Sequence, residues 1–489
     1  MIDIGSRREC FFDYYLIDEN KTTAQLVLHS PSIKEECLVF DKEWEAKATS
    51  YPHFFFDDGK YKMYYIAYSA SDSSGKPSSR VCYAESVDAL RWIKPELGIC
   101  NFNGSLKNNI VVDSTFGIKP FIDNFYVFRD DNPYCPDGEK YKGICSHDRK
   151  LWAFFSPDGL HFKKGCQITD KGAFDTLNII FWDDDAGVYR GYIRGFHAIG
   201  DLEGKDEFDE RPFDLPNDVR NLRVRDIRYI ESKDFKTWSR PKLLDFGNQK
   251  DMPLYSNQVI KYERAPHIYI GFPTRYNERK EWTGAFDVLC GKEERLRVIK
   301  ENEPRAGLAI TDCLFMCSRD GYKFTRYDKA FITPGVEHTT NWVYGDCYPT
   351  HGLALAPSHV SSEADCELSF FCQGNHRSSK PNTLIRYAIR QDGFCSFHAD
   401  GNEEVVTTKP FVFKGNSLYA NMATSAAGYV YFELKTADGE VMKSCEMFGD
   451  RVDKLIGFDK SLQDFCGKEV VLTMRMCEAD VYSIKFEDK

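Results

Sequence analysis

Short alternating stretches of apolar and polar residues dominate this chain, and they recur in similar groups. Five times a polar residue is followed by an apolar strand, a turn and another strand, as in His53-FFF-DDGK-YKMYYIAY and Asn178-IIFW-DDDAG-VYRGYI. Such pairs are typical of antiparallel strands joined by turn residues. A third and a fourth strand follow, for example RVCYAE and NNIVV. The pattern therefore predicts five four-stranded sheets.

A short turn motif follows the third strand of each group. Its first copy runs from Ser86 through Asp88 to Trp92, and the later copies contain Asp158, Asp234, Asp320 and, in degenerate form, Asp392. Ser and Asp side chains bond nearby backbone amides in tight turns, and the aromatic residue anchors the next strand. Successive aspartates are 70, 76, 86 and 72 residues apart. This repeat predicts a radial array of sheets, a five-bladed β-propeller.

The repeat stops near residue 400, and a different strand-rich pattern follows. The tail contains EEVVTTKPFVF, SLYANMATSAAGYVYFEL, EVVLTMRM and DVYSIKF. At 489 residues the chain is also too long for one ordinary core. We therefore predict an all-β protein with a five-bladed β-propeller over residues 1–400, which includes an N-terminal lead-in segment, and a C-terminal β-sandwich over residues 401–489. We expect the sandwich to serve in packing, and an accessory sugar-binding role is the alternative.

Composition narrows the class of function. A net charge of −11 argues against a nucleic-acid surface, which needs clustered Lys and Arg. Aromatic residues make up 15% of the chain, and their faces suit stacking on sugar rings. No apolar run has the length of a signal-peptide core or a membrane span, so we expect no membrane partner.

The cysteines indicate a reducing compartment. There are seventeen, an odd number, scattered through apolar strands without a paired CxxC motif. Buried free thiols in the cytoplasm are the simplest interpretation. The sequence predicts no metal site and no cofactor.

The Ser-x-Asp turns, together with the segment VFRDDNP that ends at Pro133, carry a resemblance to a known superfamily. Over about residues 40 to 400 the chain resembles the five-bladed β-propeller glycoside hydrolases, which include families 32, 43, 62 and 68. The tail is similar to the trailing sandwich of family 32. The resemblance implies a carbohydrate-active enzyme of a distant branch. It also implies that Asp130, in the Arg-Asp-Pro-like segment, stabilises a transition state.

The propeller arrangement predicts where a ligand binds. The first strand of each blade lines the central channel, and the residues just before these strands face one mouth of it. The equivalent positions are all polar, and we expect them to bind sugar hydroxyls: His53, Asn124, Asn178, Asn257 and His351. The alternative is that these side chains cap strand ends or bind water in the channel.

Hydrolysis of a glycoside needs two carboxyl groups beside the scissile bond. We expect Asp175, in the apolar stretch AFDTLN, to be the ionised one and Glu337 to be the proton donor, with Glu45 in reserve. Asp123 and Asp346 also lie shortly before first strands. Each of these acids is open to the alternative of a solvated loop or turn residue.

Three further residues are candidates for substrate contacts. Arg194 and Arg228 can orient a carboxylate or bind an anionic substrate, and ion pairing with Asp226 or other acids is the alternative. Tyr255, two residues before Asn257, can stack on a sugar or bond a catalytic carboxylate. Residues 276–305 form a charged insertion in blade four, either a solvated loop or a lid and oligomer contact.

Three functions fit these features. The first is a glycosidase acting on a small oligosaccharide or glycoside, with no nucleic-acid or membrane partner and possible homo-oligomers. The second is a glycoside phosphorylase, which needs one carboxylate and a basic cluster for phosphate, supplied by Arg194, Arg228, Arg275 and His338. The third is a non-catalytic carbohydrate-binding propeller. The number and placement of carboxylates at the mouth of the central channel distinguish the three functions.

Overall fold

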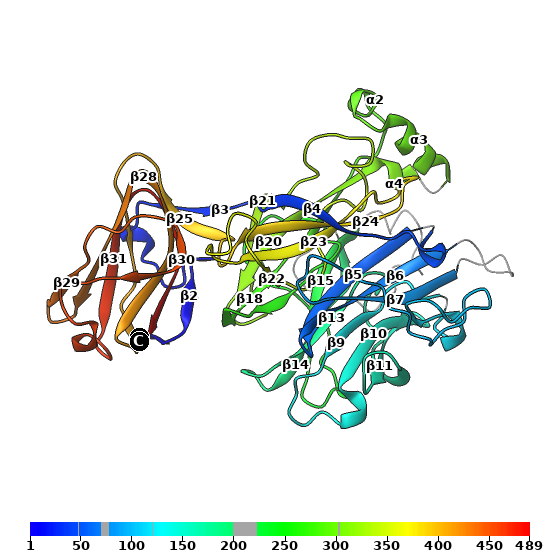
Figure 1. The fold of residues 1–489 in the computed structure, drawn as a ribbon, viewed down its shortest axis with the longest axis horizontal. Coiled ribbons are helices and arrows are strands. Elements are labelled where there is room, and N and C mark those ends of the chain that lie inside the picture. Colours follow the sequence, from blue (N-terminus) through cyan, green and yellow to red (C-terminus); the bar gives the residue numbers. More distant parts are fainter. Residues whose placement is uncertain (47, 70–77, 120, 199–222, 302–303) are drawn as a thin grey trace.

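Five antiparallel sheets follow one another along the chain and form a five-bladed β-propeller (Figure 1). The structure is a computed structural model that describes all residues except 47, 70–77, 120, 199–222 and 302–303. Blades I to III each contain four strands in chain order. Blade I has β5 (Ala48–Asp57), β6 (Lys60–Ser69), β7 (Ser78–Ser86) and β8 (Ile110–Val112). Blade II has β9 (Tyr126–Arg129), β10 (Tyr141–His147), β11 (Lys150–Ser156) and β12 (Lys163–Thr169), and blade III has β13 (Ile179–Asp183), β14 (Val188–Ala198), β15 (Arg223–Ser232) and β16 (Lys242–Leu243).

Blades IV and V depart from the simple order. Blade IV has β17 (Ile260–Tyr262), β18 (Ala265–Gly271), β19 (Thr274–Glu278), β20 (Ala309–Ser318) and β21 (Thr325–Ile332). Here β18 and β19 pair with successive parts of β20, so they act as one interrupted strand. Blade V has β22 (Ala354–Ala356), β23 (Glu367–Gly374) and β24 (Thr383–Arg390), and its outer strand is β4 (Ser32–Val39) from upstream of blade I. This pairing closes the ring with a non-local strand.

Helical segments are short. The charged insertion in blade IV folds into α2 (Gly284–Val288), α3 (Lys292–Glu301) and α4 (Pro304–Leu308), which stand at one end of the propeller (Figure 1). Single 3₁₀ turns are η1 (Glu19–Lys21), η2 (Glu43–Glu45), η3 (Ser114–Phe116), η4 (Asp137–Glu139) and η6 (Leu462–Asp464). Within the part of the chain that the structure describes, no helix is long and apolar enough to cross a membrane.

The predicted turn motif forms as expected in four of its five copies. Asp88 Oδ1 accepts hydrogen bonds from the backbone N–H groups of Leu90 and Arg91, each at 2.9 Å. The same pair of bonds recurs at Asp158, Asp234 and Asp320. Local side-chain to backbone bonding therefore explains why this repeat was readable in the sequence.

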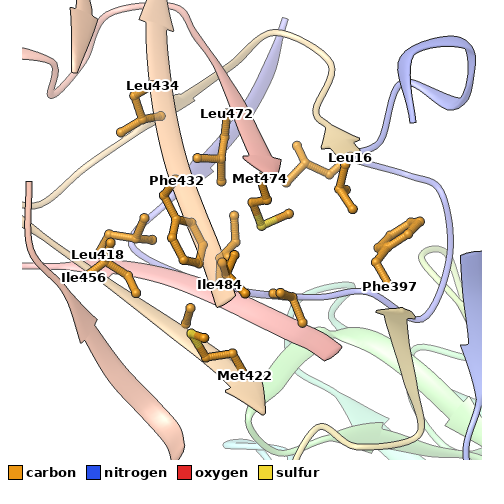
Figure 2. Close-up of a cluster of buried hydrophobic side chains, with 14 of the residues drawn as sticks. Leu16, Phe397, Leu418, Met422, Phe432, Leu434, Ile456, Leu472, Met474 and Ile484 are labelled. Atoms are coloured by element: carbon orange, nitrogen blue, oxygen red, sulfur yellow. The ribbon is translucent and has the colours of Figure 1, made fainter. Parts of the chain in front are cut away.

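The predicted assignment of the N-terminal segment to the propeller domain differs from the structure. The first strands do not lead into the propeller directly, because they pair with the C-terminal strands. The ten-stranded C-terminal sheet contains β1 (Ile2–Gly5), β2 (Arg8–Cys10), β3 (Gln25–Leu28), β25 (Cys395–Ala399), β26 (Glu404–Thr407), β27 (Phe411–Phe413), β28 (Ser417–Thr436), β29 (Val441–Lys443), β30 (Arg451–Ile456) and β31 (Val470–Glu487). Its core joins side chains from both ends of the chain, such as Leu16, Phe397, Phe432 and Ile484 (Figure 2).

The fifth copy of the turn motif, at Asp392, lies where the propeller contacts the C-terminal sheet. Asp392 is fully buried, and its carboxylate contacts groups from the N-terminal segment, blade IV and the C-terminal sheet: Arg8 at 3.3 Å, Tyr262 at 2.7 Å, Arg264 at 2.8 Å, Asn421 at 3.2 Å and Ser483 at 2.8 Å. Burial by itself raises the pKa of Asp392, but the charges of Arg8 and Arg264 outweigh this and lower that pKa below its ordinary value. The stability that Asp392 contributes is therefore fully present above the pKa of an unfolded aspartate and is lost as the pH falls through the lower pKa of the folded protein.

We expect Asp392→Asn to destabilise the protein strongly. The amide keeps the shape but leaves the buried guanidinium of Arg8 short of a counter-charge, a loss of about 3–5 kcal/mol. Asp453→Asn is the matched control, because Asp453 also pairs with Arg8 but is 46% exposed, so a loss of about 0–1 kcal/mol is expected. Urea unfolding followed by fluorescence measures both. Equal losses in the two variants would contradict the assigned role of Asp392.

All seventeen cysteines lie among the described residues and are free. Eight are buried, and burial raises the pKa of thiols such as Cys313 and Cys317 well above the ordinary value. Three are exposed: Cys290, Cys366 and Cys445.

Thiol titration with a disulfide reagent checks this arrangement. In the native protein, we expect Cys290, Cys366 and Cys445 to react first, because a buried and protonated thiol is a poor nucleophile. In denaturant all seventeen thiols should react. A shortfall of two or more in denatured protein from a reducing host would point to disulfides.

Candidate functional site

The five predicted polar residues are buried and hold the blades together. His53 donates from Nδ1 to the carbonyl of Tyr51 at 3.0 Å and accepts the Val127 N–H at Nε2, at 2.8 Å. Burial lowers the pKa of His53 to about 3, so the ring is neutral. His351 Nε2 lies 3.2 Å from the carbonyl oxygen of Val259, and burial lowers its pKa to about 4. Each histidine thus links its own blade to a neighbouring blade.

The three asparagines act in the same way. Asn124 donates to the Phe174 carbonyl and Asn257 donates to the Tyr192 carbonyl, each across a blade boundary. Asn178 donates to Thr176 within its own blade. The oxygens of Asn124, Asn178 and Asn257 accept backbone N–H groups at 3.1 Å. These bonds use the polar groups internally, so the alternative of strand capping describes this ring, and its expected contact with a sugar is corrected.

A pocket is lined instead by residues that come one to three positions before these five polar residues in the sequence. Each blade contributes at least one, and these include Tyr51, Asp123, Asp175, Tyr255 and Tyr348. They line a cavity of about 330 Å³ at one mouth of the channel. The offset has a backbone cause at blade I, where β5 carries an irregularity between Ser50 and His53 and Tyr51 adopts a φ of 54°. Such bulges re-aim side chains and are common beside functional sites.

Asp175 and Tyr255, two of the predicted residues, line the pocket, and the buried Arg194 contacts Asp175. The Asp175 carboxylate forms an ion pair with Arg194, whose side chain is 3% exposed, whereas that of Asp175 is 34% exposed. The hydroxyls of Tyr51 and Tyr255 donate to the Asp175 backbone carbonyl at 3.1 and 3.3 Å. The Arg194 guanidinium also lies 4.7 Å from the centre of the Tyr255 ring. An adjacent cation favours the carboxylate form of Asp175.

Asp123 is the second carboxyl group of the pocket, and its surroundings are different. It comes from the lead-in to blade II and lines the same cavity. Burial raises the pKa of Asp123 to about 6, and the charge of Arg194 opposes this only in part. The pocket therefore holds one carboxyl group with a strong cationic partner and one that retains its proton up to mildly acidic pH.

The predicted proton donors lie elsewhere. Glu45 is 2% exposed, and its carboxylate accepts from Tyr65 at 2.5 Å and Lys94 at 2.7 Å, while it also caps η2. Glu337 is exposed and accepts the backbone N–H of Cys290 at 3.2 Å. Neither residue is part of the pocket lining, so the expectation that either faces Asp175 across the cavity is corrected.

Other predicted residues have structural partners. Arg228 is buried and binds Asp226 through two nitrogens, at 2.8 and 2.7 Å, which is the ion-pair alternative. Asp130 is buried, pairs with Lys142 and accepts from Tyr189 at 2.8 Å. It does not line the pocket, so the transition-state role that the resemblance implied has no support in its position.

Two basic residues of the pocket were missed. Arg305 arrives on α4 of the insertion, and Arg377 arrives on the loop after β23. Arg275, which was considered for phosphate, instead pairs with Asp312. Within the described residues one carboxylate cluster is close enough for a metal ion, Asp183 to Asp185, and Lys261 Nζ contacts all three at 2.5 to 3.1 Å. That cluster has no role in the pocket.

Comparisons with known proteins give structural neighbours only. No protein-family model matches the chain, and no curated protein matches it. Among solved structures it is similar to a glycoside hydrolase family 43 arabinoxylan arabinofuranohydrolase from Bacillus subtilis, at 12% identity and a TM-score of 0.40 over 91% of this chain and 96% of that one. It is also similar to a family 32 β-fructofuranosidase of Bombyx mori, at 9% identity and a TM-score of 0.38 over 90% and 92%.

A third neighbour has a different printed activity. It is an N-acetylgalactosamine deacetylase from F. plautii in complex with blood group B trisaccharide, at 12% identity and a TM-score of 0.42 over 73% of this chain and 94% of that one. At this level of similarity the chemistry has to be argued from the site itself.

Proposed function

We propose that this protein is a glycoside hydrolase that cleaves a small oligosaccharide or glycoside in the funnel pocket. The observation that carries the proposal is the pair of Asp123 and Asp175, which line one pocket in contrasting surroundings. Glycoside hydrolysis needs one acid and one nucleophile or base. Two carboxyl groups whose environments separate their protonation states provide this division of roles.

The surroundings assign the roles. Asp123, with its raised pKa, donates a proton to the glycosidic oxygen as the bond to the anomeric carbon breaks. Asp175, held ionised by Arg194, acts as nucleophile or as the base that activates water. Tyr51, Tyr255 and Tyr348 supply aromatic surface for the apolar faces of a sugar.

The alternatives predict other arrangements. A phosphorylase needs one carboxylate beside a basic cluster, and two carboxyl groups in the pocket favour hydrolysis over that reaction. A binding propeller needs no such pair. We also propose that the protein works in a reducing compartment such as the cytoplasm, because none of its seventeen cysteines is paired.

A screen of aryl glycosides and short oligosaccharides, with and without inorganic phosphate, tests the proposal. We expect sugar release that is independent of phosphate. Release that requires phosphate would identify a phosphorylase, and binding without turnover across the panel would identify a carbohydrate-binding protein.

A further inference from the structure

A second cavity lies beside the funnel pocket that holds the two carboxyl groups. It has a volume of about 310 Å³ and is lined by β15 and by residues 243–254, which lead from blade III to blade IV. We call it the blade III–IV cavity. Lys250 lines it and is exposed, so the cavity opens to solvent. Leu254 lines this cavity and the next residue, Tyr255, lines the funnel pocket, so the two cavities share a wall.

Arg225 of β15 offers hydrogen-bond donors to the blade III–IV cavity. Its guanidinium carbon lies 3.9 Å from the centre of the Tyr276 ring, 5.7 Å from that of Tyr255 and 5.9 Å from that of Phe196. Aromatic rings attract a cation and restrict its position, but they are weak acceptors for N–H groups. Within the part of the chain that the structure describes, the buried Nε of Arg225 has no hydrogen-bond partner. Since buried polar groups are almost always hydrogen-bonded, this donor indicates a ligand with an acceptor oxygen.

Asp251 offers an acceptor in the same cavity, and His197 fixes its position. His197 donates from Nε2 to Asp251 Oδ2 at 2.8 Å and from Nδ1 to Asp226 Oδ2 at 3.0 Å. Burial by itself lowers the pKa of His197, but the hydrogen bonds to these two carboxylates outweigh this and raise that pKa above its ordinary value. The Asp251 side chain is still 29% exposed. A carboxylate has room for several donors, so Asp251 can accept further hydrogen bonds from a ligand.

The walls of the blade III–IV cavity are held in place before any ligand binds. The side chain of Gln249 donates from Nε2 to the backbone carbonyl of Arg326 at 2.5 Å and accepts the Arg326 N–H at Oε1, at 3.0 Å. The Leu254 N–H donates to the Arg225 carbonyl at 2.9 Å. These bonds tie residues 243–254 to β21 and to β15. A preorganised site avoids much of the entropy cost of ordering loops on binding.

The mixture of charges on these walls favours a neutral ligand over an ion. The charged side chains in the lining are three cations and three carboxylates besides His197: Arg225, Lys250, Arg326, Asp226, Asp245 and Asp251. An anion would meet the carboxylates and a cation would meet the basic groups, whereas a hydroxyl group donates and accepts and so suits both. Phe246 and Tyr322 also line the cavity, and aromatic rings pack against the apolar faces of sugars.

We propose that the blade III–IV cavity is a second carbohydrate-binding site, which takes a neutral, hydroxyl-rich sugar unit. Arg225 donates to the sugar hydroxyls, Asp251 accepts from them, and the ring of Phe246 or Tyr322 packs against the sugar. The site is distinct from the funnel pocket, and the inference does not depend on cleavage of a glycosidic bond.

Hydrogen–deuterium exchange measured by mass spectrometry locates the binding. The Asp175→Asn protein is used so that the probes are not consumed. The neutral probes are cellotetraose, xylotetraose, mannotetraose, maltotetraose, arabinotetraose and nystose, and the anionic probes are glucuronate and inorganic phosphate. We expect at least one neutral probe to slow exchange in residues 243–254, because a bound ligand suppresses local opening. Exchange in residues 342–348, which include lining residues of the funnel pocket, reports separately on that pocket.

Two variants of the cavity test the assigned contacts in the same background. Arg225→Gln and Asp251→Asn should each raise the sugar concentration that gives half-maximal protection of residues 243–254 by roughly 10- to 100-fold, because a charged hydrogen-bond partner is lost. Asp251→Asn comes from a different segment, so it gives an independent result if Arg225→Gln disturbs Tyr255 or fails to fold.

The matched controls remove the same charges from positions outside the cavity. Arg475→Gln acts on β31, where Arg475 is 52% exposed and pairs with Glu403. Asp184→Asn acts on a side chain that is 76% exposed. Both controls should bind every probe like the parent protein.

The outcomes separate this inference from the proposed function. Protection confined to the funnel pocket, or cavity variants that bind like the controls, would overturn the inference even if glycosides are hydrolysed. Phosphate or glucuronate that protects residues 243–254 at lower concentration than every neutral probe would also overturn it, in favour of an anion site. Sugar protection of residues 243–254 that both cavity variants weaken supports the inference, whether or not the wild type cleaves any glycoside.

Discussion

Replacement of Asp175 by Asn is expected to lower kcat by roughly 10³- to 10⁵-fold on any glycoside that the wild type hydrolyses. The change removes the carboxylate that lines the pocket and keeps nearly the same shape. Because the lost interaction belongs to the transition state, KM should change far less than kcat. Asp184→Asn is the matched control. Asp184 lies in the same blade, is 76% exposed and pairs with Lys261 at 2.5 Å, so kcat should stay within a few-fold of the wild type.

The Asn variant also leaves Arg194 buried without its partner, so folding has to be checked separately. Circular dichroism and thermal unfolding show whether the loss of turnover is catalytic. Azide provides a second readout with the smaller variant Asp175→Ala. If Asp175 is the nucleophile or the base, azide attacks the anomeric carbon in place of the carboxylate or of the activated water. The bond from this carbon to the aryl oxygen breaks, the phenolate departs, and a glycosyl azide forms. Full kcat in the folded Asn variant would exclude Asp175 from the mechanism.

The fold was largely predictable because its signals are local. The Ser86–Asp88 turn and its repeats fix a hairpin through bonds between residues two or three apart, and such bonds are visible in sequence. Non-local pairing was not visible. The sequence of residues 32–39 does not indicate that β4 completes blade V. The sequences of β1, β2 and β3 likewise do not indicate that these strands belong to the C-terminal sheet. From the sequence, Asp392 is likewise expected to be a turn residue. Its contacts between the two domains are tertiary and could not be predicted.

The position of the candidate pocket along the chain was predictable to within a few residues. The direction in which its side chains point was not. The aligned polar positions, such as His53 and Asn178, mark where each blade enters the channel, but they are used to join blades. The pocket lies one to three residues earlier, and at blades I and V the backbone there has a positive φ, at Tyr51 and Cys347. Asp175 was singled out because it lies in an apolar stretch, and the structure places it in the lining of the pocket. Arg305 and Arg377 were missed because the insertion and a long loop, whose courses the sequence does not reveal, bring them to the pocket.

If Asp123 is the proton donor, the value of kcat/KM has to depend on pH. The protonated form is the active one, and burial raises its pKa to about 6. The value of kcat/KM should therefore fall as the pH rises through about 6, and this limb should be absent in Asp123→Asn. In that variant kcat on glycosides with alkyl or sugar leaving groups should drop by roughly 10²- to 10⁴-fold. With a dinitrophenyl leaving group, which departs without protonation, the loss should be small.

This contrast between leaving groups separates an acid from a merely structural residue, which would affect both substrates alike. Stability supplies the control. An aspartate with a raised pKa contributes stability that is fully present below the pKa of the unfolded group and is lost as the pH rises through about 6. Asp123→Asn should therefore be at least as stable as the wild type at pH 7, as measured by thermal unfolding. An unchanged pH limb in the folded variant, or equal losses on both kinds of leaving group, would assign the proton to another residue of the pocket.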